Sequence, residues 1–80
     1  MDAVKVIFDI TNMADTEGEK VSTFLGALNG VTEVAMIHPH GNGHQEGHEF
    51  WVSFNADHTH AQDIHTALEH NGYHNFAVSL

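Results

Sequence analysis

Histidine is concentrated in one short stretch of this chain. Nine of the eighty residues are histidine and none is cysteine. Four of the nine lie in the eleven-residue stretch that begins at His38 and ends at His48, together with three glycines. Neutral imidazole is the commonest protein ligand for zinc, nickel, cobalt and copper(II), whereas the thiolates that favour copper(I) are absent. The residue types therefore predict a divalent transition metal ion as the cofactor: zinc, nickel, copper(II) or cobalt.

Spacing limits which histidines could share an ion. Alternate residues at the end of a strand point the same way, which favours His38 and His40 as a pair. A structural zinc site needs four ligands, and a glycine-rich loop loses entropy when it wraps an ion, so we expect at most a moderate affinity unless residues outside this stretch complete the shell. In the second predicted helix, His65 lies five residues from the neighbouring histidines, roughly 140° off a shared face, and is expected to be partly buried or on the surface instead. The predicted metal ligands are His38, His40, His44, His48, His70, His74 and Asp15, with Glu46 and Glu49 as further oxygen candidates.

The charge of the chain restricts its partners. Two basic and eleven acidic residues give a formal net charge of -9, which repels nucleic acid and anionic membrane surfaces. A salt-rich habitat would favour the same acidic composition. There is no apolar run long enough to span a bilayer and no signal-peptide pattern, so we expect a soluble chain, cytoplasmic by default. The expected partners are the metal ion, a metal transporter or a second copy of the chain, and neither nucleic acid nor membrane.

Four segments have the pattern of strands. Residues 3–11 alternate apolar and polar side chains, which predicts a half-buried strand. Residues 31–38 are rich in β-branched and apolar types, and residues 49–54 alternate again. A fourth strand is predicted at the end of the chain, over residues 76–80. The apolar residues of these strands include Val4, Val6, Phe8, Ile10, Phe50, Val52, Phe54, Phe76, Val78 and Leu80; Trp51 is expected to pack rather than to recognise a ligand.

Two segments have the pattern of helices. A Thr-x-x-Glu capping box at residues 16–19 predicts the start of the first helix, and Asn29 and Gly30 predict its end. Residues 59–62 form a second predicted capping box, for a helix that ends at Asn71 and Gly72. The apolar stripes of the two helices are Val21, Phe24, Leu25 and Leu28 in the first, and Ala61, Ile64, Ala67 and Leu68 in the second.

The order of these elements is β-α-β-β-α-β. It predicts a single α+β domain over residues 1–80, a ferredoxin-like sandwich of four antiparallel strands with both helices on one face. Because crossovers through helices are right-handed, the loop after the first strand, the hairpin between strands two and three, and the loop before the last strand lie at one end. That end collects His38 to His48, Asp15, His70 and His74. His58 and His60 are expected at the opposite end.

In this pattern the chain resembles the heavy-metal-associated domains of copper chaperones, mercury-binding proteins and metal-ATPase N-termini. The resemblance covers nearly the whole chain: Asn12-Met13 in the first loop, 28–31 before the second strand, Asp63-Ile64 in the second helix and 67–73 before the last strand. Where that family has Met-x-Cys-x-x-Cys, this chain has Met13-Ala-Asp15-Thr-Glu-Gly18. The resemblance therefore implies the fold and the end at which such domains meet metal or partner, but not the two-sulfur transfer of copper(I).

The sequence predicts a binding protein rather than an enzyme. It has no Ser-His-Asp arrangement, no glycine-rich phosphate loop after a strand and no His-Glu-x-x-His motif. We predict a histidine-rich module that sequesters, buffers or delivers a divalent metal ion. The alternative is an interaction or regulatory domain that has lost metal transfer and pairs through a sheet edge. A third idea is a pH-sensing surface, since histidine changes charge near pH 6.

Overall fold

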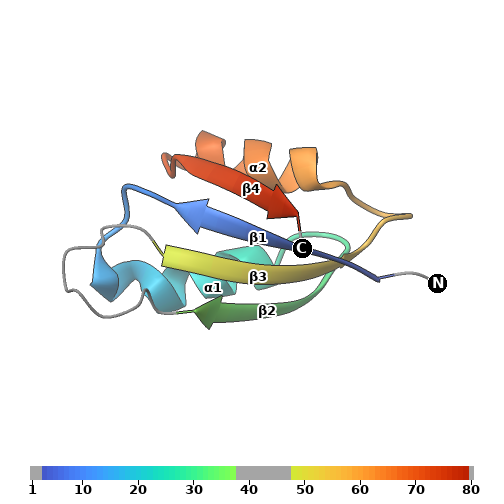
Figure 1. Cartoon of the computed structure of the whole chain (residues 1–80), viewed down its shortest axis with the longest axis horizontal. Coiled ribbons are helices and arrows are strands. Elements are labelled where there is room, and N and C mark those ends of the chain that lie inside the picture. The colour runs from blue at the N-terminus through green and yellow to red at the C-terminus, as the bar shows by residue number, and fades with distance from the viewer. Residues whose placement is uncertain (1–2, 38–47, 80) are drawn as a thin grey trace.

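The elements follow one another in the predicted order. The computed structural model describes residues 3–37 and 48–79 (Figure 1). Its strands are β1 (Ala3–Ile10), β2 (Val31–Ile37), β3 (His48–Asn55) and β4 (Asn75–Ser79). A 3-10 helix, η1 (Asp15–Glu17), leads into α1 (Gly18–Gly26), and α2 (Ala61–His70) joins β3 to β4.

The strands form one antiparallel sheet in the order β2-β3-β1-β4. Both helices pack on the same side of it, behind the strands in Figure 1. Since each crossover through a helix returns the chain parallel to the strand before it, β1 and β2 are parallel with β3 between them. The predicted ferredoxin-like α+β fold is confirmed.

The core lies between the sheet and the helices. Alternation places every second residue of β1 and β3 on the helix-facing side, where Phe8, Ile10 and Phe50 have no exposed surface. Val4, at the start of β1, continues this side but is 36% exposed. The buried apolar residues are Val6, Phe8, Ile10, Met13, Val21, Leu25, Phe50, Val52, Phe54, Ile64 and Leu68. The predicted stripe of the first helix is therefore confirmed as core-facing, with Phe24 and Leu28 partly buried. In the second helix Ile64 and Leu68 are in the core and Ala61 packs against it, while Ala67 is partly buried outside that cluster.

A β-bulge explains why β2 lacks clean alternation. Val31 pairs with Phe54 and Glu33 pairs with Ser53, so Thr32 is an extra residue in β2. Its hydroxyl donates to the Ser53 carbonyl over 3.2 Å. After the extra residue, the alternation of side chains between the two sides of the sheet is shifted by one residue. Val34 therefore lies on the helix-facing side with Val31, although the two are three residues apart.

The predicted cap of the first helix is wrong in its residues. Helix α1 begins at Gly18, after η1, and its N-cap residue Glu17 makes no side-chain cap hydrogen bond. Instead the Glu17 carboxylate accepts from the Ala14 N–H over 3.1 Å, while the Glu17 N–H donates to the Ala14 carbonyl over 2.9 Å. These two bonds close the 3-10 turn in place of the predicted box at residues 16–19. The helix also ends at Gly26, before the predicted stop, and Gly30 then turns the chain with a φ of 88°.

The second helix begins one residue later than predicted. His60 is the N-cap of α2, and its backbone N–H donates to the Asp63 carboxylate over 3.2 Å. The capping box is therefore formed by residues 60 and 63, not by 59 and 62. Thr59 is 8% exposed and packs beside Gly30, which explains why its side chain does not cap the helix.

Candidate functional site

One end of the sheet collects segments that are far apart in the sequence. Ile10, at the end of β1, pairs with His48 on one side and with Asn75 on the other. The Thr11 N–H donates to the His74 carbonyl over 3.0 Å. His48 and His74 therefore flank the end of β1, as predicted. We call this the histidine end.

Asn12 ties the first loop to the last loop at the histidine end. Its Nδ2 donates to the Gly72 carbonyl over 2.9 Å, and its Oδ1 accepts from the His74 N–H over 2.9 Å. An amide side chain is suited to this position because it supplies one donor and one acceptor. Asn12 therefore holds the backbone of His74 in a set place relative to β1.

The side chain of His74 has a carboxylate partner. His74 Nδ1 lies 3.4 Å from Glu69 Oε1, and the two side chains are 72% and 37% exposed. An exposed pair of this kind adds little stability. In the tautomer that carries its proton on Nδ1, toward the carboxylate, Nε2 keeps its lone pair for an ion. Sequence reasoning missed Glu69, since a separation of five residues across a helix end matches no ligand motif.

Glu69 is itself positioned by a buried amide. Asn75 is 6% exposed, and its backbone N–H donates to Glu69 Oε2 over 3.3 Å. Its Nδ2 lies near three acceptors: the Tyr73 carbonyl at 3.2 Å, and the His65 carbonyl and Glu69 Oε2, both at 3.5 Å. These acceptors set the orientation of the amide, so Asn75 Oδ1 is the atom that faces His65 Nδ1 at 2.8 Å. His65 therefore donates from Nδ1. Its ring is partly buried, which is one of the two placements predicted for it.

The remaining predicted ligands are only partly described. His70 is exposed at the last position of α2, and Asp15 begins η1, directly after the loop that Asn12 anchors. His38, His40 and His44 lie outside the described residues, as do Glu46 and the side chains of Asp15 and His48. Within the described part of the chain, no three acidic or histidine side chains are grouped closely enough to hold a metal ion.

Gly18 is the residue that the predicted resemblance places at the second cysteine position of the heavy-metal-associated family. The residue is buried, and a Cβ built on it would lie 2.5 Å from the sulfur of Met36 on β2. A side chain at this position would therefore have to displace the end of Met36. Because the two nearest atoms belong to the flexible end of the Met36 side chain, a small shift of that side chain would relieve the contact, and packing alone does not require glycine here.

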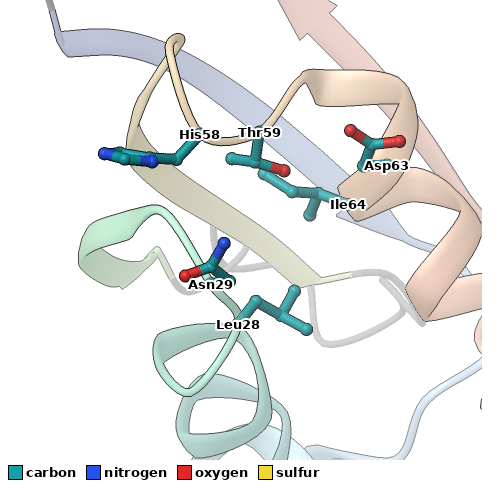
Figure 2. Close-up of a pocket in the computed structure, with 6 residues that line it drawn as sticks. All are labelled: Leu28, Asn29, His58, Thr59, Asp63 and Ile64. Atoms are coloured by element: carbon teal, nitrogen blue, oxygen red, sulfur yellow. The ribbon is translucent and has the colours of Figure 1, made fainter.

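The opposite end of the domain carries a separate depression. It is lined by Leu28 and Asn29 after α1, by His58 and Thr59 after β3, and by Asp63 and Ile64 of α2. Figure 2 shows Leu28 and Ile64 on its apolar inner side, while the His58 ring and the Asp63 carboxylate lie at opposite sides. The predicted position of His58 and His60 away from the histidine end is confirmed, and the polar groups here do not converge on one point.

Neither helix in the part of the chain that the structure describes is long and apolar enough to cross a membrane. The βαββαβ order agrees with the fold that the resemblance implies, while membership of the heavy-metal-associated family remains a prediction. No protein-family model, curated protein or solved structure matches this chain.

Proposed function

We propose that this chain is a histidine-rich module that sequesters, buffers or delivers a divalent transition metal ion at its histidine end. The observation that supports the proposal is the Glu69–His74 pair, with His74 Nδ1 3.4 Å from the carboxylate. Histidines that bind metals commonly donate their other ring N–H to a carboxylate in this way. Glu69 is held by the buried Asn75, so the carboxylate is in place before any ion arrives.

The positions of the strand ends support the same site. Ile37 pairs with Glu49, so β2 ends and β3 begins at the histidine end, where the segment containing His38, His40 and His44 is attached. His70 and Asp15 belong to elements that end or begin there. Imidazole and carboxylate together suit zinc, nickel, cobalt or copper(II), and the proposed site has no thiolate to favour copper(I).

We further propose a relationship to the heavy-metal-associated domains. The shared element order, the buried Met13 and the loop held by Asn12 support it. Because Asp15 and Gly18 stand at the two cysteine positions, the proposed function departs from copper(I) transfer. A metal transporter, or a second copy that shares the ion, is the proposed partner.

Titration of untagged, metal-free protein with zinc, nickel and copper(II) tests the proposal. We expect saturation near one equivalent, with changes in histidine ring NMR signals at His70 and His74 and within residues 38–48. His74→Ala should weaken binding about 10- to 100-fold, and Glu69→Gln should weaken it by a similar or smaller factor. Binding should also weaken as the pH falls, because the ligand form of imidazole is neutral.

His58→Ala is the matched control, since this exposed histidine lies at the other end of the domain. It should leave affinity and stoichiometry unchanged. Weak shifts spread over all nine histidines, without saturation, would contradict the metal site and favour the interaction-domain alternative. Equal losses from His58→Ala and His74→Ala would contradict the proposed location.

A further inference from the structure

The side of the sheet away from the helices carries large apolar side chains. On β4, Asn75 and Ala77 face α2, so Phe76 and Val78 point the other way and are 61% and 50% exposed. Trp51 lies on this side too, because its neighbours Phe50 and Val52 are buried on the helix-facing side. No element of the described residues covers this side, which we call the open face (Figure 1).

Four apolar residues of the open face, one from each strand, are paired side by side and form a row across the sheet, which we call the apolar row. Ala35 of β2 pairs with Trp51 of β3, Trp51 pairs with Ile7 of β1, and Ile7 pairs with Val78 of β4. Ile7 and Trp51 are half-buried, while Ala35 is exposed. With strands about 4.8 Å apart, the row is about 14 Å long. A row of apolar residues of this kind is typical of a surface that meets another protein.

A pair of carboxylates lies beside the apolar row. Asp9 of β1 and Glu49 of β3 are directly opposite each other, two residues from Ile7 and Trp51 and therefore on the same side of the sheet. Like charges directly opposite on adjacent strands are destabilising. Phe76 lies on the other side of Asp9, as its partner on β4. A basic side chain of a partner protein, placed between the two carboxylates, would relieve their repulsion. Apolar side chains next to it in the partner would then cover the apolar row.

We propose that the open face binds a basic amphipathic helix of a partner protein. The net charge of -9 opposes a second copy as the occupant, because the copy would bring the same charge and only two lysines, of which Lys5 alone lies on the open face. A helix rises 1.5 Å per residue, so about ten residues span the row, with one apolar stripe on Ile7, Trp51 and Val78. Lysine or arginine beside that stripe would lie near Asp9 and Glu49.

The probe is a synthetic amphipathic peptide of leucine and lysine, roughly 14 residues long so that its central ten can form a helix. Titrations are run in a metal chelator, so that failure of the metal site and failure of this surface remain distinguishable. We expect a change in Trp51 fluorescence and amide NMR shifts confined to the open face around Ile7, Ala35, Trp51 and Val78. Added salt should weaken the complex.

Two sets of variants assign the binding to this face. Val78→Ser and Phe76→Ser remove exposed side chains at little cost to folding, and each should weaken peptide binding about tenfold. Glu49→Gln should also weaken it, while leaving the free chain as stable as before or slightly more stable. Val4→Ser is the matched control, because Val4 is 36% exposed but lies on the helix-facing side.

The following results would overturn the proposal. One is no binding of the leucine-lysine peptide, or equal binding of a scrambled peptide or of a leucine-glutamate peptide. Another is binding that shifts residues of α1 and α2 instead of the open face. Sedimentation equilibrium of the chain alone provides the remaining test, because a dimer that Val78→Ser dissociates would make a second copy the occupant.

Discussion

Gly30→Ala is expected to lower the free energy of unfolding by about 2 to 4 kcal/mol, a large share of the stability of a domain this small. Gly30 has a φ of 88°, a conformation that costs an L side chain about 1 to 2 kcal/mol. A Cβ would also lie 2.9 Å from Thr59 Cγ2 and 3.0 Å from His58 Cβ. The Asn55 N–H donates to the Gly30 carbonyl over 2.8 Å, so the loop has little freedom to move away.

Gly72→Ala is the matched control for this substitution. Its φ of 87° is the same, but a Cβ there would meet nothing within 4 Å, so we expect only the conformational cost. Urea unfolding followed by Trp51 fluorescence compares the two. Adding Thr59→Ser to Gly30→Ala removes the nearest methyl group and should recover about 1 kcal/mol of the crowding cost. Equal losses for the two alanine variants would show that crowding by Thr59 contributes nothing.

Asn75→Asp is expected to cost about 2 to 4 kcal/mol although the two side chains have the same shape. The change replaces Nδ2 with an oxygen that faces the Tyr73 and His65 carbonyls and the Glu69 carboxylate. Oδ1 can still accept from His65 Nδ1. The result is a buried charge next to three acceptors, with Glu69 repelled from the position in which it meets His74.

Asn71→Asp provides the comparison, because Asn71 is exposed and its amide donates to the Ala67 carbonyl over 2.9 Å. It places a charge at the C-terminus of α2 and should cost at most about 1 kcal/mol. Thermal unfolding measures both, and the ring signals of His65 report whether its hydrogen bond to position 75 survives. A cost for Asn75→Asp no greater than that for Asn71→Asp would contradict the role assigned to the buried amide.

Local signals in the sequence were right about elements and wrong about their first residues. Apolar spacing predicted both helices because the residues it marks, Val21, Leu25, Ile64 and Leu68, are the ones that the helices bury. The first residue of a helix depends instead on which nearby side chain is free to form a cap hydrogen bond with the backbone. Thr59 is committed to packing against Gly30, so Asp63 bonds to the N-cap residue instead.

The sequence by itself determined the order of strands and helices, and through the handedness of crossovers the end at which His48 and His74 meet. It also placed His38, His40 and His44 as candidates, which lie outside the described residues. Only the tertiary structure decided that Asn12 and Glu69 position His74. Asn12 bonds to Gly72 and His74 across about sixty residues of chain, and Glu69 reaches His74 around the end of α2, so neither contact follows from a local pattern.

The same distinction applies to the two faces of the sheet. Alternation in the sequence predicts which residues of a strand share one side of the sheet. Which of the two sides is buried depends on where the helices pack. Phe76 and Val78 have the composition of a core strand, yet they are exposed because β4 presents Asn75 and Ala77 to α2. The pairing of Asp9 with Glu49, and the row from Ala35 to Val78, follow from strand register, which is a property of the assembled sheet rather than of any one segment.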